Sequence, residues 1–425
     1  MRVVGLAALP IVVLLVVPRA AMNGGAISEA LSTDATACAG AAWSPLREQP
    51  WLHVETWFAS LADAHGTFVA ADDVVAANRG VADRVPLAVF NLTTRKRLNP
   101  PADGHLFVYP IVAGGDGGLQ LLWGEVADDE RSRLATWPPP VTELWWSRLG
   151  TNGRWSKATR IFSAKSIYWQ PTTTDRASGD AKHPALITVP VIDDAGSGVL
   201  LIRIGRVSAE ATVLRVDGGL AYSAIGRNVD DHMLVAFVGA KRGSGEDHNS
   251  VFTMQSSDGG RRWNEASLIS RSGRRFASQV RVIAGGRGQW DLVWLQNITD
   301  GERPEVLRHV SSTDDGNNWS IPDDLKIPDL ITMLRVGRDE CGDIHAILEE
   351  HPNGHSQGSR ILDATWSRDQ WSALREPFPG RVLLDPALLR SQDGRLSLYA
   401  NLFEKPTGAQ RWARPVISKL TQRAR

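Results

Sequence analysis

The chain contains 425 residues, 43% of them hydrophobic and 22% charged, which is enough apolar material to bury a substantial core in one large domain. Its 47 lysines and arginines balance its 47 aspartates and glutamates, so it lacks the basic excess that marks nucleic-acid-binding proteins. The 39 glycines and 23 prolines supply many turns, which agrees with an all-β domain.

The amino terminus has the pattern of an export signal. Arg2 precedes an uncharged, mostly apolar run from Val3 to Val17, and Pro18 and Arg19 end it. A run of about fifteen residues fits the core of a signal peptide better than a membrane span, which needs about 20 residues. We predict that residues 1–26 are a signal peptide or an uncleaved anchor and that residues 27–50 are a linker. The remaining chain would then be secreted or extracytoplasmic, with any membrane association limited to the N-terminal segment.

The two cysteines, Cys38 and Cys341, would meet an oxidising compartment. Cys38 belongs to the Ala-rich leader, and Cys341 lies in a turn before an expected strand. A disulfide between them and two unpaired thiols are both compatible with the sequence.

Residues 51–425 are expected to form one domain of repeated sheets. Six short apolar runs each follow a turn residue, and such runs predict buried strands rather than helices. We assign each run as the inner strand of one sheet. The six runs are Gly118–Trp123, Gly198–Ile202, His232–Phe237, Gln289–Trp294, Asp343–Leu348 and Gly394–Tyr399.

The sheets are expected to form a closed arrangement, completed by the two ends of the domain. Residues Val382 to Leu420 supply an inner strand and two more strands. The stretch from Trp51 to Leu106 contributes either the missing outer strand or a seventh sheet, through Gly66–Ala70 and Val85–Phe90. The sequence therefore favours six sheets, with seven as the alternative.

An eight-residue pattern, S-x-D-x-G-x-x-W, occurs twice. Its first copy contains Ser256, Asp258, Gly260 and Trp263, and its second contains Ser312, Asp314, Gly316 and Trp319. Ser and Asp side chains accept hydrogen bonds from the amides of such a turn, and Gly allows a positive φ. Weaker copies end at Trp155 and Trp371, which indicates a period of roughly 54 residues.

The pattern resembles the Asp box of the sialidase superfamily, which is also known as the BNR repeat. The resemblance implies an all-β, six-bladed β-propeller with Asp-box turns, or a seven-bladed one, because a ring of sheets buries faces that one sheet cannot bury alone. In that family the boxes lie at the periphery, so Asp258 and Asp314 are expected to stabilise turns rather than to catalyse.

The resemblance also suggests where catalytic residues would lie. Sialidases bind the substrate carboxylate with three arginines and use a tyrosine nucleophile, with an aspartate as acid/base. The nearest match to the first arginine is Arg84, in Arg84-Val85-Pro86, and only Tyr399 comes late enough to match the tyrosine. A solvated loop position is the commoner role for a residue like Arg84, and packing within a strand is the commoner role for Tyr399, so both are weak candidates and the catalytic residues are otherwise unknown. The other two arginines have no match, although Arg281, Arg308 and Arg360 lie on expected strands.

No metal site or cofactor motif is evident. Pro352 and Gly354 indicate a turn around His351 and His355 rather than a metal-binding helix face. The 16 tryptophans could pack between sheets or, if exposed, bind sugar rings.

Two functions follow. The first is an extracytoplasmic sialidase-like propeller that binds a glycan or protein ligand at its central mouth without a cofactor. The alternative is a divergent, exo-sialidase-like glycoside hydrolase that acts on acidic sugars.

Overall fold

In the computed structural model the chain divides into two compact units, residues 1–39 and 40–425, and every described residue belongs to the second unit. No α-helix occurs in these described residues, so the predicted all-β class is confirmed. The described ranges are 42–48, 58–63, 66–72, 87–101, 107–115, 118–125, 141–150, 152–168, 172–173, 178–179, 184–205, 208–216, 218–240, 249–270, 276–298, 306–327, 330–352, 359–390, 395–403 and 413–421.

The first three sheets along the chain contain strands β3 to β19 and are antiparallel except where noted. The first consists of β3 (Phe58–Asp63), β4 (Gly66–Asp72), β5 (Leu87–Asn91) and β6 (Lys96–Leu98). A nine-stranded sheet follows, in which β10 pairs with β13 and the two-residue β12 pairs in parallel with β7. Its strands are β7 (Phe107–Gly115), β8 (Gln120–Glu125), β9 (Val141–Arg148), β10 (Thr159–Ile167), β11 (Thr172–Thr173), β12 (Ser178–Gly179), β13 (Ala185–Asp193), β14 (Gly196–Ile204) and β15 (Ala209–Arg215). The third is β16 (Leu220–Arg227), β17 (Met233–Gly239), β18 (Ser250–Ser256) and β19 (Ser267–Ser270).

Three further antiparallel sheets complete the unit. They are β20 (Ala277–Ala284), β21 (Trp290–Gln296), β22 (Val306–Ser312) and β23 (Asp323–Lys326); then β24 (Ile331–Arg338), β25 (Ile344–Glu350), β26 (Arg360–Ser367) and β27 (Gln370–Trp371); and finally β28 (Val382–Arg390), β29 (Leu396–Phe403) and β30 (Ala413–Thr421). The short strands β1 (Ala42–Trp43) and β2 (Arg47–Glu48), within the predicted linker, both pair with β30.

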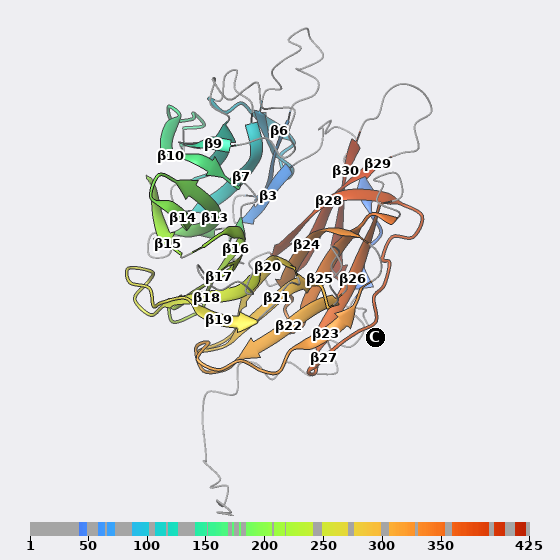
Figure 1. The fold of residues 1–425 in the computed structure, drawn as a ribbon. Coiled ribbons are helices and arrows are strands. Elements are labelled where there is room, and N and C mark those ends of the chain that lie inside the picture. The colour runs from blue at the N-terminus through green and yellow to red at the C-terminus, as the bar shows by residue number, and fades with distance from the viewer. Residues whose placement is uncertain are drawn as a thin grey trace, which may run out of the picture. The chain divides into compact units, whose positions relative to one another are not determined.

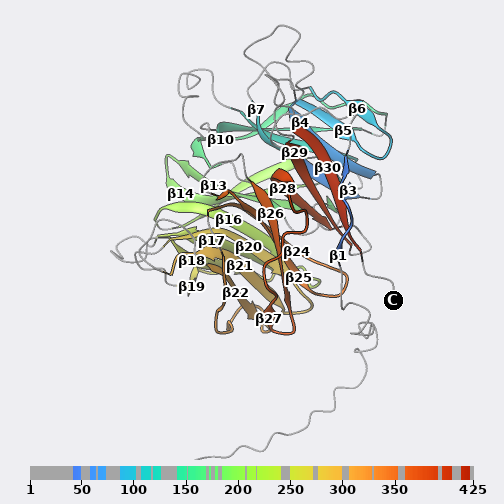
Figure 2. The same cartoon turned by 90° about the vertical axis from the view of Figure 1, so that its right-hand side faces the viewer.

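The six apolar runs all form strands, but they are the second strand of their pairings rather than the inner strand that we predicted. Another strand precedes each run and pairs with it, as β20 precedes β21 and β24 precedes β25. These first strands make most of the contacts between sheets. Successive contacts join β3, β7, β13, β16, β20, β24 and β28 in that order, and β28 lies against β3 again (Figures 1 and 2).

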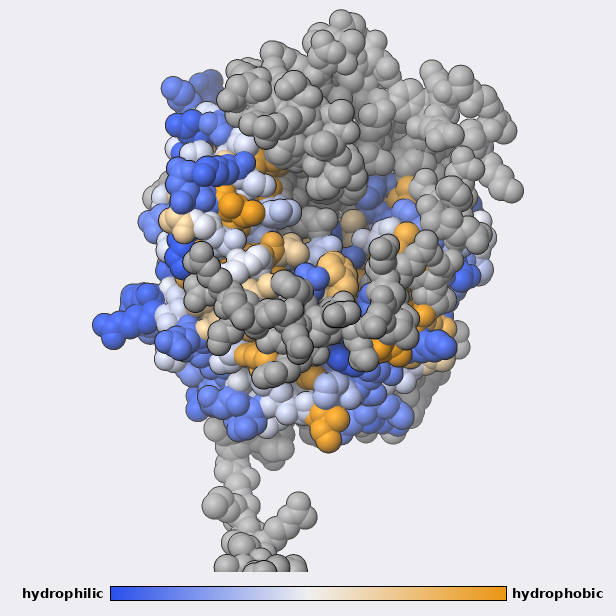
Figure 3. Space-filling view, viewed as in Figure 1, coloured by the Kyte–Doolittle hydropathy of each residue, from blue (hydrophilic) through white to orange (hydrophobic). Residues whose placement is uncertain are grey.

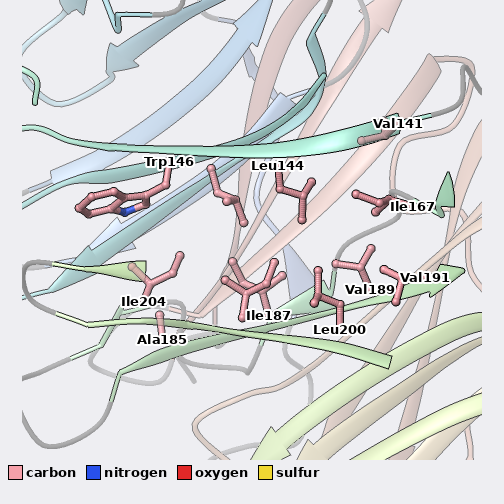
Figure 4. Close-up of a cluster of buried hydrophobic side chains, with 12 residues drawn as sticks. Val141, Leu144, Trp146, Ile167, Ala185, Ile187, Val189, Val191, Leu200 and Ile204 are labelled. Carbon is pink, nitrogen blue, oxygen red and sulfur yellow. The ribbon is translucent and has the colours of Figure 1, made fainter. Parts of the chain in front are cut away.

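The core consists of apolar side chains packed between neighbouring sheets and, in the nine-stranded sheet, between its own strands. Figure 4 shows one such layer, in which Leu144 and Trp146 of β9 face Ile187 of β13 and Leu200 of β14. Every residue of β21 is buried, including Trp290 and Trp294. Burial on both faces explains why the second strands are continuous apolar runs.

The two octapeptide turns share the hydrogen bonds of their Ser and Asp side chains. In the second turn, Ser312 Oγ accepts a bond from the Gly316 amide at 2.9 Å and donates one to Asp314 Oδ1 at 2.8 Å, while that oxygen accepts the Asn318 amide at 2.9 Å. The first turn repeats this scheme with Ser256 and Asp258, and both glycines have positive φ, +77° for Gly260 and +79° for Gly316. The indole of Trp263 donates to the Gly260 carbonyl at 3.0 Å. The side chains therefore stabilise each turn locally.

A buried polar cluster connects β1 to the sheet of β24 to β27. The Trp43 indole donates to Asp363 Oδ2 at 3.0 Å, and His345 lies between Asp363 and Asp339 with both N···O distances at 3.3 Å. Asp339 also accepts the amide of Cys341, which is disulfide-bonded. Cys38 lies outside the described residues, so its pairing stays a prediction.

Candidate functional site

The first strands of three successive sheets are irregular at the same point. Pairing shifts register around Gln279 in β20, Thr332 in β24 and Asp385 in β28. Gln279 and Asp385 have positive φ, 51° and 54°, which is uncommon for residues other than glycine. Bulges of this kind redirect side chains and are frequent next to active sites.

Hydrogen bonds between sheets hold these irregular segments in place. The Gln279 side chain donates to the Thr332 carbonyl at 3.0 Å and accepts the Leu334 amide at 2.7 Å. Arg335 Nε donates to the carbonyl of Pro386, directly after Asp385, at 3.0 Å. Three successive sheets are thus joined by contacts between residues that are more than fifty positions apart in the chain.

Arg281 is the principal cation of this region. Its Nε and Nη2 donate to the Leu334 carbonyl at 3.1 and 2.8 Å, and its Nη1 donates to the Val280 carbonyl at 2.9 Å. No carboxylate of the described part of the chain forms an ion pair with it. A guanidinium has five N–H donors, so one N–H on each Nη is left for another acceptor.

Two neighbours modify the electrostatics of Arg281. Burial and the adjacent Arg335 guanidinium lower the pKa of Arg281 to about 9, because both disfavour a second positive charge there. Burial raises the pKa of Tyr222 on β16, and the nearby Arg281 opposes that shift. The three side chains therefore influence one another electrostatically.

A carboxyl pair lies on the other side of Arg335. Glu349, at the end of β25, accepts the Asp385 amide at 2.7 Å, the Thr332 hydroxyl at 3.0 Å and a hydrogen bond with His351 Nε2 at 2.6 Å. Burial and the Glu349 charge raise the pKa of Asp385 to about 6, although Asn401, Arg335 and His351 oppose the shift. We call Tyr222, Arg281, Arg335, Glu349, His351 and Asp385 the arginine–carboxylate cluster.

The cluster and the octapeptide turns lie at opposite ends of the sheets. The turn after β22 begins at Ser312, which pairs with Trp290 at the start of β21, and Asp315 bonds to Gly288 in the β20–β21 turn. Gln279 lies instead near the start of β20, beside the end of β21. This separation is consistent with a structural role for the octapeptide turns.

The residues singled out from sequence have different locations. Arg84 lies outside the described residues, and Tyr399 is 5% exposed within β29, as strand packing requires. Arg308 forms two bonds of 2.6 Å with Asp324 on the edge strand β23, and Arg360 is paired with Glu350 and Glu376. Of the three arginines singled out from sequence on expected strands, Arg281, Arg308 and Arg360, only Arg281 belongs to the cluster.

Sequence reasoning missed Tyr222, Arg335, Glu349 and Asp385. A signal for three of them is an isolated polar residue in the strand before an apolar run, such as Tyr222 in β16, Arg335 in β24 and Asp385 in β28, because burying a polar or charged side chain is costly unless it is hydrogen-bonded or paired.

Other features of the described surface are less suited to a ligand. A cavity of ≈ 470 Å³ is lined by Pro352, Ser359, Arg360, Glu376 and residues 380–382, but its Arg360 already has two carboxylate partners. Hydrophobic residues form separate small groups on the face in Figure 3, and the exposed large ones are Tyr168, Val229, Ile298 and Ile321. The largest fully buried side chains of the described residues include three tryptophans, Trp123, Trp290 and Trp294.

No group of residues able to hold a metal ion occurs in the ranges given above. Within the same ranges, no helix has the length and apolar character needed to cross a membrane.

No protein-family model matches the chain, and no curated protein matches it. Several solved structures match it. The polysaccharide lyase Uly1 is 12% identical with a TM-score of 0.57, over 87% of this chain and 91% of the lyase. An α-L-arabinanase from Penicillium chrysogenum complexed with arabinobiose is 15% identical with a TM-score of 0.45, over 75% and 95% of the two chains. A Trypanosoma rangeli sialidase in complex with sialic acid is 10% identical with a TM-score of 0.44, over 88% and 59%. The likeness to the lyase shows a shared fold over most of both chains.

Proposed function

We propose that this protein is an extracytoplasmic, sialidase-like β-propeller that binds an acidic glycan through the arginine–carboxylate cluster. The observation that carries the proposal is Arg281, a desolvated guanidinium that is held by carbonyl groups and has two N–H donors left. Two parallel N–H donors match a carboxylate better than any neutral group, because the contact is bidentate and charge-assisted.

The propeller has seven blades in this proposal, the alternative that the sequence left open. The stretch between residues 58 and 98 forms a four-stranded sheet of its own, and the cycle of contacts passes through seven first strands. The last blade is completed by β1 and β2 from the beginning of the unit, which pair with β30. Pairing of the two ends of a chain within one blade is a means of closing a ring.

The ligand class follows from chemistry and is supported by the fold. The lyase with the same fold acts, by its name, on a polysaccharide. Uronic and sialic acids carry a carboxylate next to hydroxyl groups, which Arg281 and Arg335 would bind together with the Tyr222 hydroxyl.

The test is titration calorimetry of the purified mature protein with galacturonate trisaccharide and with 3′-sialyllactose, using neutral maltotriose as the control sugar. Replacing Arg281→Lys keeps the charge and removes the planar fork. We expect it to weaken binding of an acidic sugar by about 10- to 150-fold, which corresponds to about 1.5–3 kcal/mol for a charge-assisted contact.

The matched control variant is Arg308→Lys, because Arg308 lies two strands away from β20 and is already paired with Asp324 on the edge strand β23. It should bind as the wild type does. If the protein binds maltotriose as tightly as the acidic sugars, Arg281 is not a carboxylate site. The same conclusion follows if Arg281→Lys and Arg308→Lys weaken the affinity for acidic sugars equally.

A second candidate is glycoside hydrolysis of acidic sugars. It is favoured by Asp385, a carboxyl group whose pKa of about 6 allows it to donate and accept protons near neutrality, beside the carboxylate of Glu349. Release of the fluorophore from a fluorogenic sialoside or galacturonide would support it, provided that Asp385→Asn abolishes the release. Turnover that persists in this variant would assign it to a contaminant or to another residue.

A further inference from the structure

We propose that the first two sheets carry a second binding surface, which takes a linear acidic polysaccharide. The surface is formed by Arg95, Lys96, Arg154 and Lys157, and we call these four residues the basic rim. It lies at the end of the sheets opposite to the arginine–carboxylate cluster. The inference therefore goes beyond the proposed function and is testable separately from it.

Two of the four cations belong to the turn between β5 and β6. The Asn91 side chain accepts the amides of Thr93 and Thr94 at 3.0 and 2.9 Å, which holds the turn, and Arg95 has a positive φ of 58°. Arg95 and Lys96 are both exposed. The turn therefore presents two adjacent positive charges to solvent.

The other two cations belong to the segment between β9 and β10. Asn152 Oδ1 accepts the Arg154 amide at 3.0 Å, the Gly150 amide donates to the Arg154 carbonyl at 2.8 Å, and Gly153 has a φ of +74°. Arg154 and Lys157 are exposed, and Trp155 between them in the chain is half-buried. These two charges therefore flank an indole that is partly open to solvent, and a flat aromatic face suits a sugar ring.

Both turns lie at the same end of their sheets as the octapeptide turns. The first turn follows β5, the third strand counted from β3, and the second follows β9, the third strand counted from β7. The octapeptide turns likewise follow the third strands β18 and β22 of their sheets. Since successive strands within these sheets are antiparallel, corresponding turns lie at corresponding ends, away from the cluster.

The two turns also belong to neighbouring sheets that pack against each other. Leu98 of β6, and Trp155 and Ala158 beside the second turn, pack against the same buried cluster, which includes Val89 of β5 and Leu121 of β8. The strands β3 and β4 both contact β7. The basic rim therefore spans one contact between sheets rather than two unrelated turns.

The positive charge of the basic rim is not balanced by its own segments. Residues 87–101 and 147–168 contain no Asp or Glu, although the whole chain has equal numbers of acidic and basic residues. Arg160 and Lys165 of the second segment are not part of the rim, because each is paired with a carboxylate. Among the described residues, none forms an ion pair with a side chain of the basic rim.

A long polyanion fits these features better than a small anion does. Exposed cations attract a single anion weakly, because water and salt screen each charge. A polysaccharide with one carboxylate on each sugar contacts several cations at once, so that weak contacts add up along the chain.

Two other polyanions fit less well. A membrane surface requires apolar residues that enter the lipid, and the exposed large hydrophobic residues of the described ranges, Tyr168, Val229, Ile298 and Ile321, belong to neither turn. The balanced charge of the whole chain is not typical of a protein that binds nucleic acid.

The experiment is biolayer interferometry of the purified mature protein on immobilised polygalacturonate, in about 0.1 M and about 1 M NaCl, where the screening lengths are about 10 and 3 Å. Arg154→Gln/Lys157→Gln should raise the Kd about fivefold in the lower salt, because two exposed charge contacts are lost. Arg95→Gln/Lys96→Gln should have a similar effect. Both differences should disappear in the higher salt.

The matched control is Arg160→Gln/Lys165→Gln, which removes the same two residue types from the same segment but takes them from ion pairs. It should bind polygalacturonate as the wild type does, and circular dichroism verifies that each variant is folded. An equal loss in the control would mean that net charge attracts the polymer, which would overturn the basic rim.

The remaining outcomes separate the basic rim from the cluster and from other ligands. If the rim variants bind polygalacturonate as the wild type does, while Arg281→Lys weakens binding of galacturonate trisaccharide, the basic rim is wrong and the proposed function stands. If the rim variants lose polymer binding although no sample binds the trisaccharide, the basic rim stands and the cluster is not the glycan site. Tighter binding of single-stranded DNA or phosphatidylglycerol vesicles than of polygalacturonate would show that the ligand class is wrong.

Discussion

His345 provides the sharpest test of the buried polar cluster that connects β1 to the sheet of β24 to β27. The side chain is buried on β25, with Asp339 and Asp363 each 3.3 Å from one of its ring nitrogens. Burial by itself would lower the pKa of His345, but the hydrogen bonds and charges of the two aspartates outweigh it and raise the pKa to about 9. The perturbation is His345→Gln, which keeps hydrogen-bonding capacity and removes the charge.

The magnitude follows from proton linkage. The folded pKa of about 9 exceeds the ordinary histidine value of 6.5 by about two and a half units, so protonation contributes about 3 kcal/mol to the free energy of unfolding. Because the folded pKa is raised, this contribution is fully present below about pH 6.5 and is lost as the pH rises through 9.

Urea denaturation of the disulfide-intact protein at pH 6 and pH 10 measures this contribution. The difference in free energy of unfolding between wild type and His345→Gln should shrink by about 3 kcal/mol between the two pH values. His232→Gln is the control, because His232 pairs with Asp315 in a half-exposed position where such pairs contribute little. A difference that is the same at pH 6 and pH 10 would refute a protonated His345.

Two further predictions concern packing and turn stability. A Cβ at Gly226 would lie 2.6 Å from Val282 Cγ1 and 2.9 Å from Trp290 Cζ3, so Gly226→Ala should lower the urea-derived free energy of unfolding by about 1–3 kcal/mol; an unchanged value would mean that β16 and β20 are not this close. Ser312→Ala leaves the Gly316 amide without its acceptor and should cost about 1–3 kcal/mol in the same assay, while the affinity for galacturonate trisaccharide stays unchanged; a loss of affinity without a loss of stability would contradict the purely structural role of the turn.

Features that depend on neighbours along the chain were predictable from the sequence. The octapeptide turns are stabilised by hydrogen bonds that span at most four residues, so the pattern of Ser, Asp and Gly is enough to specify them. The apolar runs are likewise recognisable in the sequence, because a strand that is buried on both faces is mostly apolar. The strand β17 is of this kind, while β21 and β25 are equally buried but carry a few paired polar residues.

The order of the strands and the location of the site depend on contacts that are distant in the chain. The first strands β20 and β24 carry Gln279, Arg281 and Arg335. These polar residues interrupt the apolar pattern by which a buried strand is recognised from sequence. Their hydrogen-bond partners lie in the next sheet, more than fifty residues later, as with Arg281 and Leu334.

The amino-acid sequence by itself determined the β-strand content, the repeated turns and the most deeply buried strands of this protein, because each follows from the chemistry of a short segment. Only the tertiary structure decided that residues 58–98 form a sheet of their own, that β1 and β2 pair with β30, and that Arg281, Arg335, Glu349 and Asp385 meet at one end of three sheets. The physical reason is that these arrangements are set by packing between sheets, where each polar side chain is stabilised by a partner that its own segment does not contain.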